Sequence, residues 1–332
     1  MKLFFQFCGP AALRKPWETE AMLDSFRQSL RAADHPRYRV AESERAADVI
    51  ALVESVAPKD WRYLAALAAE PVIRRRPESC FTINYDDDAA GFLPGLYAGL
   101  SAGRFHPKKH RATGYLLKRT DRVDEHAAKR DRVPPRLLFS FRGANSHPVR
   151  ARLFDLDALR TPHTKILRID RWFDHTAQEE IDYFDEILES HFILCPRGIA
   201  ATSHRIFEVM QLGRVPVILS DDWIAPAGPA WQKFSIRIAE AKLDALPEVL
   251  RLRLPEAHEM GRLARLEWER WFAPDTKMLT AATAIEDLAL TRPPSFTALS
   301  ALKEWHSFRK RWEMGWSLPH RLQRRVLRFL PL

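Results

Sequence analysis

Short apolar runs alternate with segments of helical periodicity in the first part of the chain. Three of these runs have the length and the aromatic or β-branched content of buried strands: Leu3–Phe7, Asp48–Val53 and Ser79–Tyr85. Between the first two runs, Met22, Phe26 and Leu30 recur at helical spacing. Trp61–Ala69 is a second helical segment, which Pro71 ends. The order strand, helix, strand, helix, strand predicts a parallel sheet covered by helices.

A second alternation of the same kind begins near Arg136. Its apolar runs predict strands at Leu137–Phe141, Lys165–Ile169, Phe192–Cys195 and Val215–Leu219. The segments between them predict helices at about Pro148–Leu159, Gln178–Glu189 and Ser203–Leu212. One apolar stripe runs along the second of these helices: Ile181, Phe184, Ile187 and Leu188. Helical periodicity returns at Pro255–Phe272 and Thr276–Leu288, and Pro293-Pro294 ends it before one or two tail helices.

The length of 332 residues fits about two domains. We expect an N-terminal Rossmann-like domain over 1–133, a second Rossmann-like domain over 134–290, and C-terminal helices rich in Trp and Arg over 291–332. Periodicity is weak between Arg104 and Arg132, so this stretch is expected to bridge the domains or to enter the cleft between them.

The richest group of polar residues lies in one β-α-β unit, within residues 191–222. The predicted strand before the helix runs into Pro196-Arg197-Gly198, and the strand after it runs into Ser220-Asp221-Asp222. Such a unit gathers its polar groups at the carboxyl ends of its strands. A helix that begins there presents free N–H groups and a positive dipole end to an anion.

Two arginines and a glutamate of this unit suit a nucleotide. Arg197 follows the strand, and Arg205 lies in the first helical turn, where a cation is unfavourable unless an anion shares the site. Guanidinium forks fit phosphate oxygens, and Glu208, on the same helix face as Arg205, could accept both hydroxyls of a ribose. The alternatives are ordinary ion pairs, of Arg197 with Asp221 or Asp222 and of Arg205 with Glu208.

Other residues near this unit have two interpretations each. Gly198 allows close backbone approach to a ligand or is only a turn glycine. Ser203 caps the helix, contacts phosphate, or does both. His204 is expected to reach a phosphate or the sugar. Arg142-Gly143, at the end of the first strand of this domain, is a second candidate for a phosphate or base contact.

The same stretch resembles the donor-binding half of the exostosin-like inverting glycosyltransferases of family 47. The positions that carry the resemblance are Cys195-Pro196-Arg197-Gly198, Ser203, Arg205, Glu208, Gly213, Pro216-Val217-Ile218 and Ser220-Asp221-Asp222. Two further segments are similar to the beginning and the end of that half: Arg136–Gly143 with Val149-Arg150, and Leu246–Leu250 with Trp271-Phe272. The resemblance covers roughly residues 135–275 and fades before residue 130.

The resemblance implies a fold and an activity. The fold is GT-B, two facing Rossmann-like domains with C-terminal helices packed across them. The activity is transfer of a sugar from a nucleotide diphosphate donor, a UDP-sugar, to a hydroxyl of a glycan or glycoconjugate. GT-B enzymes need no obligatory metal, so we expect no cofactor. Asp221-Asp222 are expected to bind the donor, although they could mimic the metal-binding acidic pair of another glycosyltransferase architecture. The acceptor and linkage are not implied.

A base for the acceptor hydroxyl is expected in the first domain. Asn84-Tyr85-Asp86-Asp87-Asp88 ends a predicted strand, and adjacent carboxylates repel one another, which favours proton uptake. We therefore expect Asp87 or Asp88 to act as the base. The loop could instead only cap a helix near Ala89. His106 is the alternative base, because an imidazole is neutral and basic near pH 7.

Charge is unevenly distributed along the chain. The formal net charge of +9 concentrates in residues 104–136 and 301–332, and such segments suit an anionic ligand, nucleic acid or an anionic membrane, or are simply solvated. Few aromatic residues accompany the first segment, which disfavours nucleic acid. At 46% apolar residues the chain can bury substantial cores. Cys8, Cys80 and Cys195 share no close spacing, so neither a disulfide framework nor a zinc site is indicated.

The C-terminal segment has the pattern of an interfacial amphipathic helix, with arginines on one face and apolar residues on the other. The alternative is a helix packed on the protein's own surface. Because no run is long enough to span a membrane, we expect a cytoplasmic protein, either free or attached to the cytoplasmic face of a membrane, that resembles bacterial members of the family. The rival functions are a GDP-sugar transferase and a non-catalytic basic protein that binds anionic polysaccharide or membrane.

Overall fold

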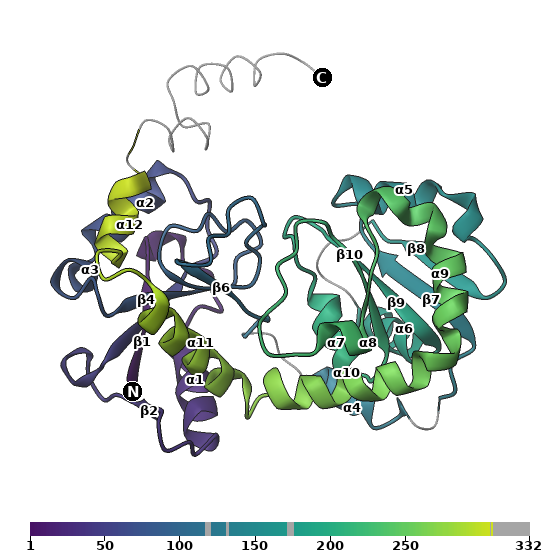
Figure 1. The fold of residues 1–332 in the computed structure, drawn as a ribbon, viewed down its shortest axis with the longest axis horizontal. Coiled ribbons are helices and arrows are strands. Elements are labelled where there is room, and N and C mark those ends of the chain that lie inside the picture. Colours follow the sequence, from purple (N-terminus) through teal and green to yellow (C-terminus); the bar gives the residue numbers. More distant parts are fainter. Residues whose placement is uncertain (117–120, 131–132, 171–175, 306, 308–332) are drawn as a thin grey trace, which may run out of the picture. The chain divides into compact units, whose positions relative to one another are not determined.

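The computed structural model describes residues 1–116, 121–130, 133–170, 176–305 and 307. Its contacts divide the chain into two compact units. The first unit comprises Met1–Tyr97, Arg104–Arg111 and the chain from Ala281 onward. The second unit comprises Ala98–Gly103 and Ala112–Thr280. Each unit is built around a sheet of its own (Figure 1).

The sheet of the first unit has the strand order β2-β1-β3-β4-β5-β6. Its strands are β1 (Lys2–Cys8), β2 (Arg39–Val40), β3 (Val49–Glu54), β4 (Cys80–Asn84), β5 (Gly95–Tyr97) and β6 (His110–Ala112). The pairs from β2 to β5 are parallel, with Phe4 opposite Ile50 and Leu52 opposite Thr82. The helices are α1 (Glu20–Ala32), α2 (Trp61–Ala69), α3 (Pro71–Arg75), α11 (Lys277–Thr291) and α12 (Ala298–Trp305), with short 3-10 helices η1 (Ala11–Leu13) and η2 (Glu44–Ala46).

The sheet of the second unit has the order β11-β10-β9-β7-β8, and its pairs are parallel. Its strands are β7 (Leu137–Gly143), β8 (Thr164–Arg168), β9 (Ser190–Pro196), β10 (Val215–Leu219) and β11 (Ile236–Arg237). The helices are α4 (Asp121–Ala127), α5 (Pro148–Asp155), α6 (Ala177–Leu188), α7 (His204–Gln211), α8 (Trp231–Phe234), α9 (Leu246–Arg253) and α10 (Ala257–Trp271). The 3-10 helices are η4 (Asp157–Leu159), η5 (Glu240–Ala245) and η6 (Leu254–Glu256).

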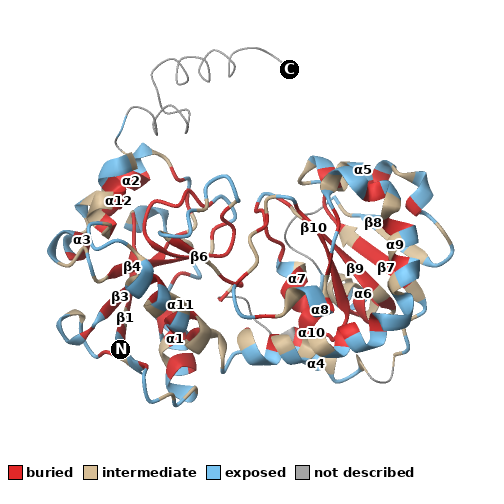
Figure 2. Cartoon of the chain, viewed as in Figure 1, coloured by how far each residue is buried: buried red, intermediate tan, exposed pale blue. Residues whose placement is uncertain are grey.

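Burial explains why the apolar runs form strands. Every residue of β3, β4 and β10 is buried, as expected for parallel strands covered on both faces (Figure 2). One helix-facing layer of the second sheet packs Phe139, Phe192 and Val217 into a single core. The other layer packs Ile193 and Ile218 against α6, α7 and α10. The predicted α/β class with two parallel sheets, which a GT-B chain requires, is confirmed.

The predicted strands and helices are present, with shifted ends. The helix predicted over Pro148–Leu159 ends at Asp155, and a separate 3-10 turn follows it. A capping box between Thr176 and Glu179 fixes the start of α6. The patterns did not reveal the short strands β2, β5, β6 and β11 or the helices α3 and α4, because elements of two to seven residues carry little periodicity.

The division by contacts differs from the predicted boundary at residue 133. Residues from Ala112 onward join the second unit because Gly114 lies against Phe207 and Phe272, and Tyr115 stacks on His204. The part of α11 from Ala281 onward joins the first unit, where Glu286 accepts from both Arg37 and Tyr38 at 2.7 Å. α12 lies beside α2 and α3 (Figure 1) and packs its Ala298 and Leu302 into the core of the first unit.

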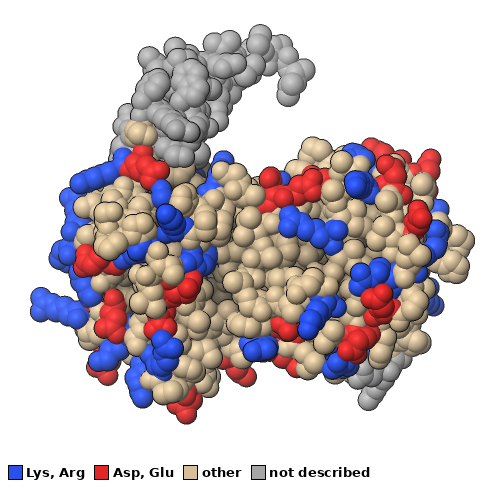
Figure 3. Space-filling view, viewed as in Figure 1, with Lys and Arg blue, Asp and Glu red and all other residues tan. Residues whose placement is uncertain are grey.

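Charges of both signs are mixed on the face of the molecule seen in Figure 3. Within the predicted basic segment, Arg104, Lys109 and Arg111 form ion pairs with Asp88, Glu304 and Asp287, respectively. The predicted interfacial amphipathic helix of the C-terminal segment lies outside the described residues. In the part of the chain that the structure describes, no helix combines the length and the hydropathy needed to cross a membrane.

Candidate functional site

The second sheet has its topological switch point between β7 and β9. The chain leaves β7 for β8 on one side and later adds β9, β10 and β11 on the other side. The loops that follow β7 and β9 therefore diverge, and ligands of open parallel sheets bind in the crevice at such a point, beyond the carboxyl ends of the strands. Gly143 ends one of these strands, and Pro196 ends the other, with Arg197-Gly198 directly after it.

Arg150 of α5 joins the two diverging loops. Its Nε donates to the carbonyl oxygen of Arg197 at 2.8 Å, and its two other nitrogens donate at 3.2 Å to the carbonyls of Pro196 and Ala144. These bonds satisfy strand-end carbonyls that the sheet leaves open. Arg150 therefore fixes the geometry of the crevice.

Arg197 follows β9, and only part of its guanidinium has hydrogen-bond partners in the described residues. Its Nη1 pairs with Oδ2 of Asp222 at 2.6 Å. The ion pair that was predicted as the alternative to a phosphate contact is therefore present. The Arg197 side chain is 14% exposed, while that of Asp222 is 48% exposed. Nε of Arg197 is buried and has no hydrogen-bond partner among the described residues. A buried donor without a partner is costly, and an incoming anion would satisfy it.

The loop that contains Arg197 leads to the N-terminus of α7, which offers further donors. Ser203 is the N-cap residue, but its side chain makes no capping hydrogen bond. The neighbouring hydroxyl of Thr202 is buried and lacks a described partner. A Cβ on Gly198 would lie 3.0 Å from Oγ of Ser146, so a larger residue would crowd the loop. Unsatisfied N–H groups at a helix start favour an anion.

Arg205 and Glu208 are connected through a tyrosine that the sequence analysis missed. Nε of Arg205 donates to the hydroxyl of Tyr183 at 3.2 Å, and that hydroxyl donates to Glu208 at 2.7 Å. Arg205 also donates to the carbonyl of Arg142, and its guanidinium lies 4.8 Å from the ring centroid of Phe141. Burial raises the pKa of Tyr183 well above its ordinary value, so the hydroxyl remains a donor.

Arg142 and Gly143 lie at the carboxyl end of β7. The side chain of Arg142 pairs at 3.1 Å with Glu186 of α6, which also binds Lys165 at 3.0 Å. Glu186 is 3% exposed. The side chain of Arg142, a predicted phosphate or base contact, is therefore held in an ion cluster of the protein itself.

His204 and Asp221 also have protein partners. His204 is exposed at the start of α7, and its ring stacks on Tyr115 with centroids 3.3 Å apart. Asp221 and Glu240 exchange two bonds, each from a backbone N–H to the other's carboxylate, at 3.1 and 3.2 Å. Asp221 thus ties the loop after β10 to η5.

The candidate bases belong to the first unit. Asp87 and Asp88 are exposed in the loop after β4, and Asp88 accepts from Arg104 at 3.3 Å. His106 is also exposed, and its Nδ1 accepts from the N–H of Lys108 at 3.3 Å. The third aspartate, Asp86, is buried.

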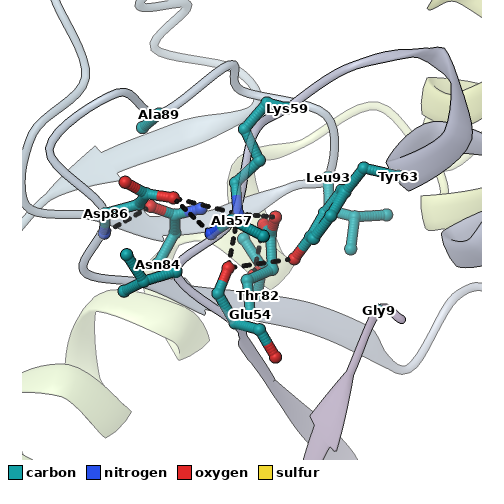
Figure 4. Close-up of polar contacts among 12 residues, drawn as sticks. Gly9, Glu54, Ala57, Lys59, Tyr63, Thr82, Asn84, Asp86, Ala89 and Leu93 are labelled. Carbon is teal, nitrogen blue, oxygen red and sulfur yellow. Dashed lines mark hydrogen bonds and ion pairs between the residues drawn. The ribbon is translucent and has the colours of Figure 1, made fainter. Parts of the chain in front are cut away.

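A buried ion cluster surrounds Asp86 at the carboxyl end of the first sheet (Figure 4). Nζ of Lys59 lies 3.1 Å from Asp86 and 3.8 Å from Glu54, and it donates to the carbonyl of Ser55 at 2.6 Å. Thr82 donates to Glu54 at 2.8 Å. The other oxygen of Asp86 accepts from the N–H of Asp88. The cluster thereby fixes the loop that carries the candidate bases.

These features define a two-sheet α/β chain of the Rossmann-like class, with arginines and a helix N-terminus at the switch point of its second sheet. The Exostosin GT47 domain family matches residues 61–252, more than half of the chain, and the chain belongs to that family. The match includes the loops after β4, β7, β9 and β10.

Curated relatives are similar over shorter stretches. The Exostosin-1 homolog of Caenorhabditis elegans is 34% identical over 95 residues, which are 27% of this chain and 25% of the relative. A probable glucuronosyltransferase of Oryza sativa subsp. japonica is 32% identical over 80 residues, 24% of this chain and 19% of the relative. The chain therefore spans about a quarter or less of these relatives. Among solved structures, Anabaena HepE in complex with UDP-glucose has a TM-score of 0.40 at 11% identity, covering 87% of this chain and 98% of that chain.

Proposed function

We propose that this chain is an inverting glycosyltransferase that moves a sugar from a nucleotide diphosphate donor, a UDP-sugar, to a hydroxyl of a glycan or glycoconjugate. Membership of the Exostosin GT47 domain family supports this activity. The observation that carries it is the unsatisfied donor set of Arg197, Thr202 and the α7 N-terminus at the switch point of the second sheet.

In this proposal the diphosphate lies against Arg197 and the first turn of α7. A phosphate oxygen satisfies Nε of Arg197 and the N–H groups that Ser203 leaves uncapped. These groups neutralise the leaving diphosphate without a metal ion. No obligatory cofactor is therefore proposed. Arg205 acts indirectly, because its bonds to Tyr183 and to the carbonyl of Arg142 hold the site together.

Glu208 is proposed to bind the ribose hydroxyls. It is 8% exposed and held by Tyr183, and it lines a small pocket together with Tyr115 and Phe207. A carboxylate can accept hydrogen bonds from both hydroxyls of a vicinal diol. His204, at the start of the same helix, is proposed to contact the phosphate or sugar.

The chemical step is a single in-line displacement. The acceptor oxygen forms a bond to the anomeric carbon as the bond from that carbon to the diphosphate oxygen breaks. The acceptor proton passes to a carboxylate, Asp87 or Asp88, or alternatively to His106. The electron pair of the broken bond remains on the nucleoside diphosphate, which the positive groups of the second unit stabilise.

Thermal unfolding in the presence of nucleotides tests this function. UDP, GDP, ADP and CMP are compared, each with and without Mg²⁺ or Mn²⁺. A ligand at a hundredfold excess over its dissociation constant stabilises the folded state by about 2.7 kcal/mol. We expect UDP to raise the Tm without metal. A response to GDP alone would assign a GDP-sugar donor, and no response to any nucleotide would contradict the proposed transferase.

The non-catalytic alternative is less well supported by the described basic residues. Arg104, Lys109 and Arg111 bind carboxylates of their own unit instead of presenting a continuous cationic surface. Cytoplasmic location and attachment to an anionic membrane remain predictions, since the basic tail lies outside the described residues.

A further inference from the structure

His147 caps a helix at the switch point of the second sheet, and this fixes its tautomer. It is the N-cap of α5, four residues after the end of β7. Its Nδ1 accepts from the N–H of Val149 at 3.3 Å. A neutral imidazole that accepts at Nδ1 carries its proton on Nε2. The neutral side chain therefore caps the helix with one nitrogen and remains a donor at the other.

The loop of His147 lies directly against the proposed diphosphate site. Ser146, the preceding residue, would be 3.0 Å from a Cβ placed on Gly198. Arg150, in the first turn of α5, donates to the carbonyl of Arg197. The β7–α5 loop and the β9–α7 loop are thus in contact at the point where the sheet topology places a ligand.

Four charged groups surround His147, one from each neighbouring element. Arg150 belongs to α5, Arg197 follows β9, Asp222 follows β10, and Glu240 begins η5. Oε2 of Glu240 lies 4.0 Å from Nδ1 of His147. Burial and the guanidinium of Arg197 lower the pKa of His147 below its ordinary value, although Glu240 opposes this effect. The imidazole is therefore neutral in the ligand-free protein at neutral pH.

We propose that His147 is a proton-linked contact for the donor diphosphate: it is neutral in the free protein and takes up one proton from solvent when the diphosphate binds. The inference rests on the proposed function, because it assumes that the diphosphate lies beside Arg197. The new proton resides on Nδ1, where Glu240 is its partner and the cap to Val149 is lost. Nε2–H donates to the diphosphate.

The physical cause is the change of local charge. In the free protein, the positive charges of Arg197 and Arg150 disfavour an imidazolium. A bound diphosphate carries at least two negative charges and compensates both guanidinium groups. The charged form of His147 then becomes favourable. By linkage, a site that gains a proton on binding holds its ligand more tightly at lower pH.

The variant His147→Asn separates this role from the structural one. Asn is as good an N-cap residue as Asp or Ser, so α5 keeps its cap, while the titrating group is lost. His191→Asn is the matched control. His191 is a half-buried histidine at the amino end of β9, and burial also lowers its pKa. Thermal unfolding of the three proteins confirms that each is folded.

Calorimetric titrations with UDP and with GDP, from pH 5.5 to pH 8.5, test the inference. Comparing each variant with the wild type at the same pH cancels the titration of the nucleotide's own phosphate. We expect the wild-type affinity to fall, relative to His147→Asn, by up to about tenfold per pH unit between the pKa values of the free and bound states. His191→Asn should follow the wild type. Repeating the titration in buffers of different ionisation enthalpy should show proton uptake by the wild type and less by His147→Asn.

Each outcome distinguishes the inference from the function. If a nucleotide binds the wild type and His147→Asn with the same pH dependence, the proton linkage is overturned and the donor site stands. If neither UDP nor GDP binds the wild type, the proposed function fails, and the inference fails with it.

Discussion

The carboxyl ends of the two sheets differ in how completely their buried charges are satisfied. In the first unit, the ammonium of Lys59 is surrounded by Asp86, Glu54 and the carbonyl of Ser55, and it lies 3.9 Å from the ring centroid of Tyr63. In the second unit, Arg197 has one carboxylate and a buried nitrogen without a described partner. A satisfied cluster holds loops in place, whereas unsatisfied donors at a switch point indicate a ligand site.

The sign of the charge differs as well. Carboxylates outnumber cations around Lys59, while in the second unit Arg150 binds the carbonyl of Arg197, in the loop that leads to the N-terminus of α7. The anionic donor therefore suits the second unit. The first unit has a fixed loop that bears the exposed carboxylates of Asp87 and Asp88, the proposed bases.

Removing Lys59 should have the largest effect, and it tests the claim that the buried charges of the first unit satisfy one another. Lys59→Met leaves Glu54 and Asp86 buried without their cation, and we expect a loss of about 3–5 kcal/mol in the free energy of unfolding, measured by urea denaturation. Arg75→Met, which breaks an exposed pair with Glu44, is the control and should cost about 1 kcal/mol or less. Equal effects of the two changes would contradict the account of the cluster.

Acid should also destabilise the first unit through His110 of β6. Burial lowers the pKa of His110 to about 3, while an unfolded chain has a pKa near 6.5. Between these values only the unfolded state binds the proton. The free energy of unfolding should therefore fall by about 1.4 kcal/mol for each pH unit below about 6.5. His110→Gln should show a smaller fall, and exposed His163→Gln should show the wild-type fall. Identical pH profiles for wild type and His110→Gln would count against neutral burial.

Arg197→Ala tests the second half of the comparison. We expect the Kd for UDP to rise by about tenfold to a hundredfold, because hydrogen bonds between charged groups are lost. The Tm should change little, since the partner carboxylate of Asp222 is half exposed. Arg262→Ala removes an exposed arginine of α10 and should leave the affinity unchanged. Unchanged affinity of Arg197→Ala would remove Arg197 from the donor site.

The smallest expected effect on UDP affinity comes from Tyr183→Phe, which tests the role of Glu208. Tyr183→Phe removes the hydroxyl that connects Glu208 to Arg205, at a cost of about 1–3 kcal/mol in unfolding free energy. UDP affinity should fall only a few-fold, because the carboxylate itself remains. An effect on affinity as large as that of Arg197→Ala would mean that Tyr183 touches the donor.

The sequence predicted the framework well because the central strands of both sheets are buried on both faces. Their apolar runs, such as Val215–Leu219, are unmistakable, and the loop chemistry after them follows from strand direction. Tyr183 was missed because a search for an apolar stripe passes over a hydroxyl-bearing residue beside it. Lys59 was missed because a lysine in a predicted loop is usually solvated. Its burial depends on Asp86 and Glu54, which only the fold brings together.

For single residues, the sequence alone did not decide which tertiary contacts form. The pairing of Arg197 with Asp222 was one of two stated alternatives, and a spacing of 25 residues cannot decide between a pair and a ligand contact. The segment from Ala112 to residue 133 was assigned to the first domain because its weak periodicity did not indicate which helix or strand it packs against. Packing of Gly114 and Tyr115 on α7 is a tertiary contact that no local pattern encodes.

Hydrogen exchange of backbone amides, with and without saturating UDP or GDP, tests the central claim most directly. The account predicts slower exchange in peptides that cover residues 197–206, where Gly198 and the first turn of α7 meet the diphosphate. Peptides that cover residues 54–60, around Lys59, should exchange at the same rate in both states. Protection around Lys59 instead, or nucleotide binding without protection of residues 197–206, would contradict the assignment of the donor to the second unit.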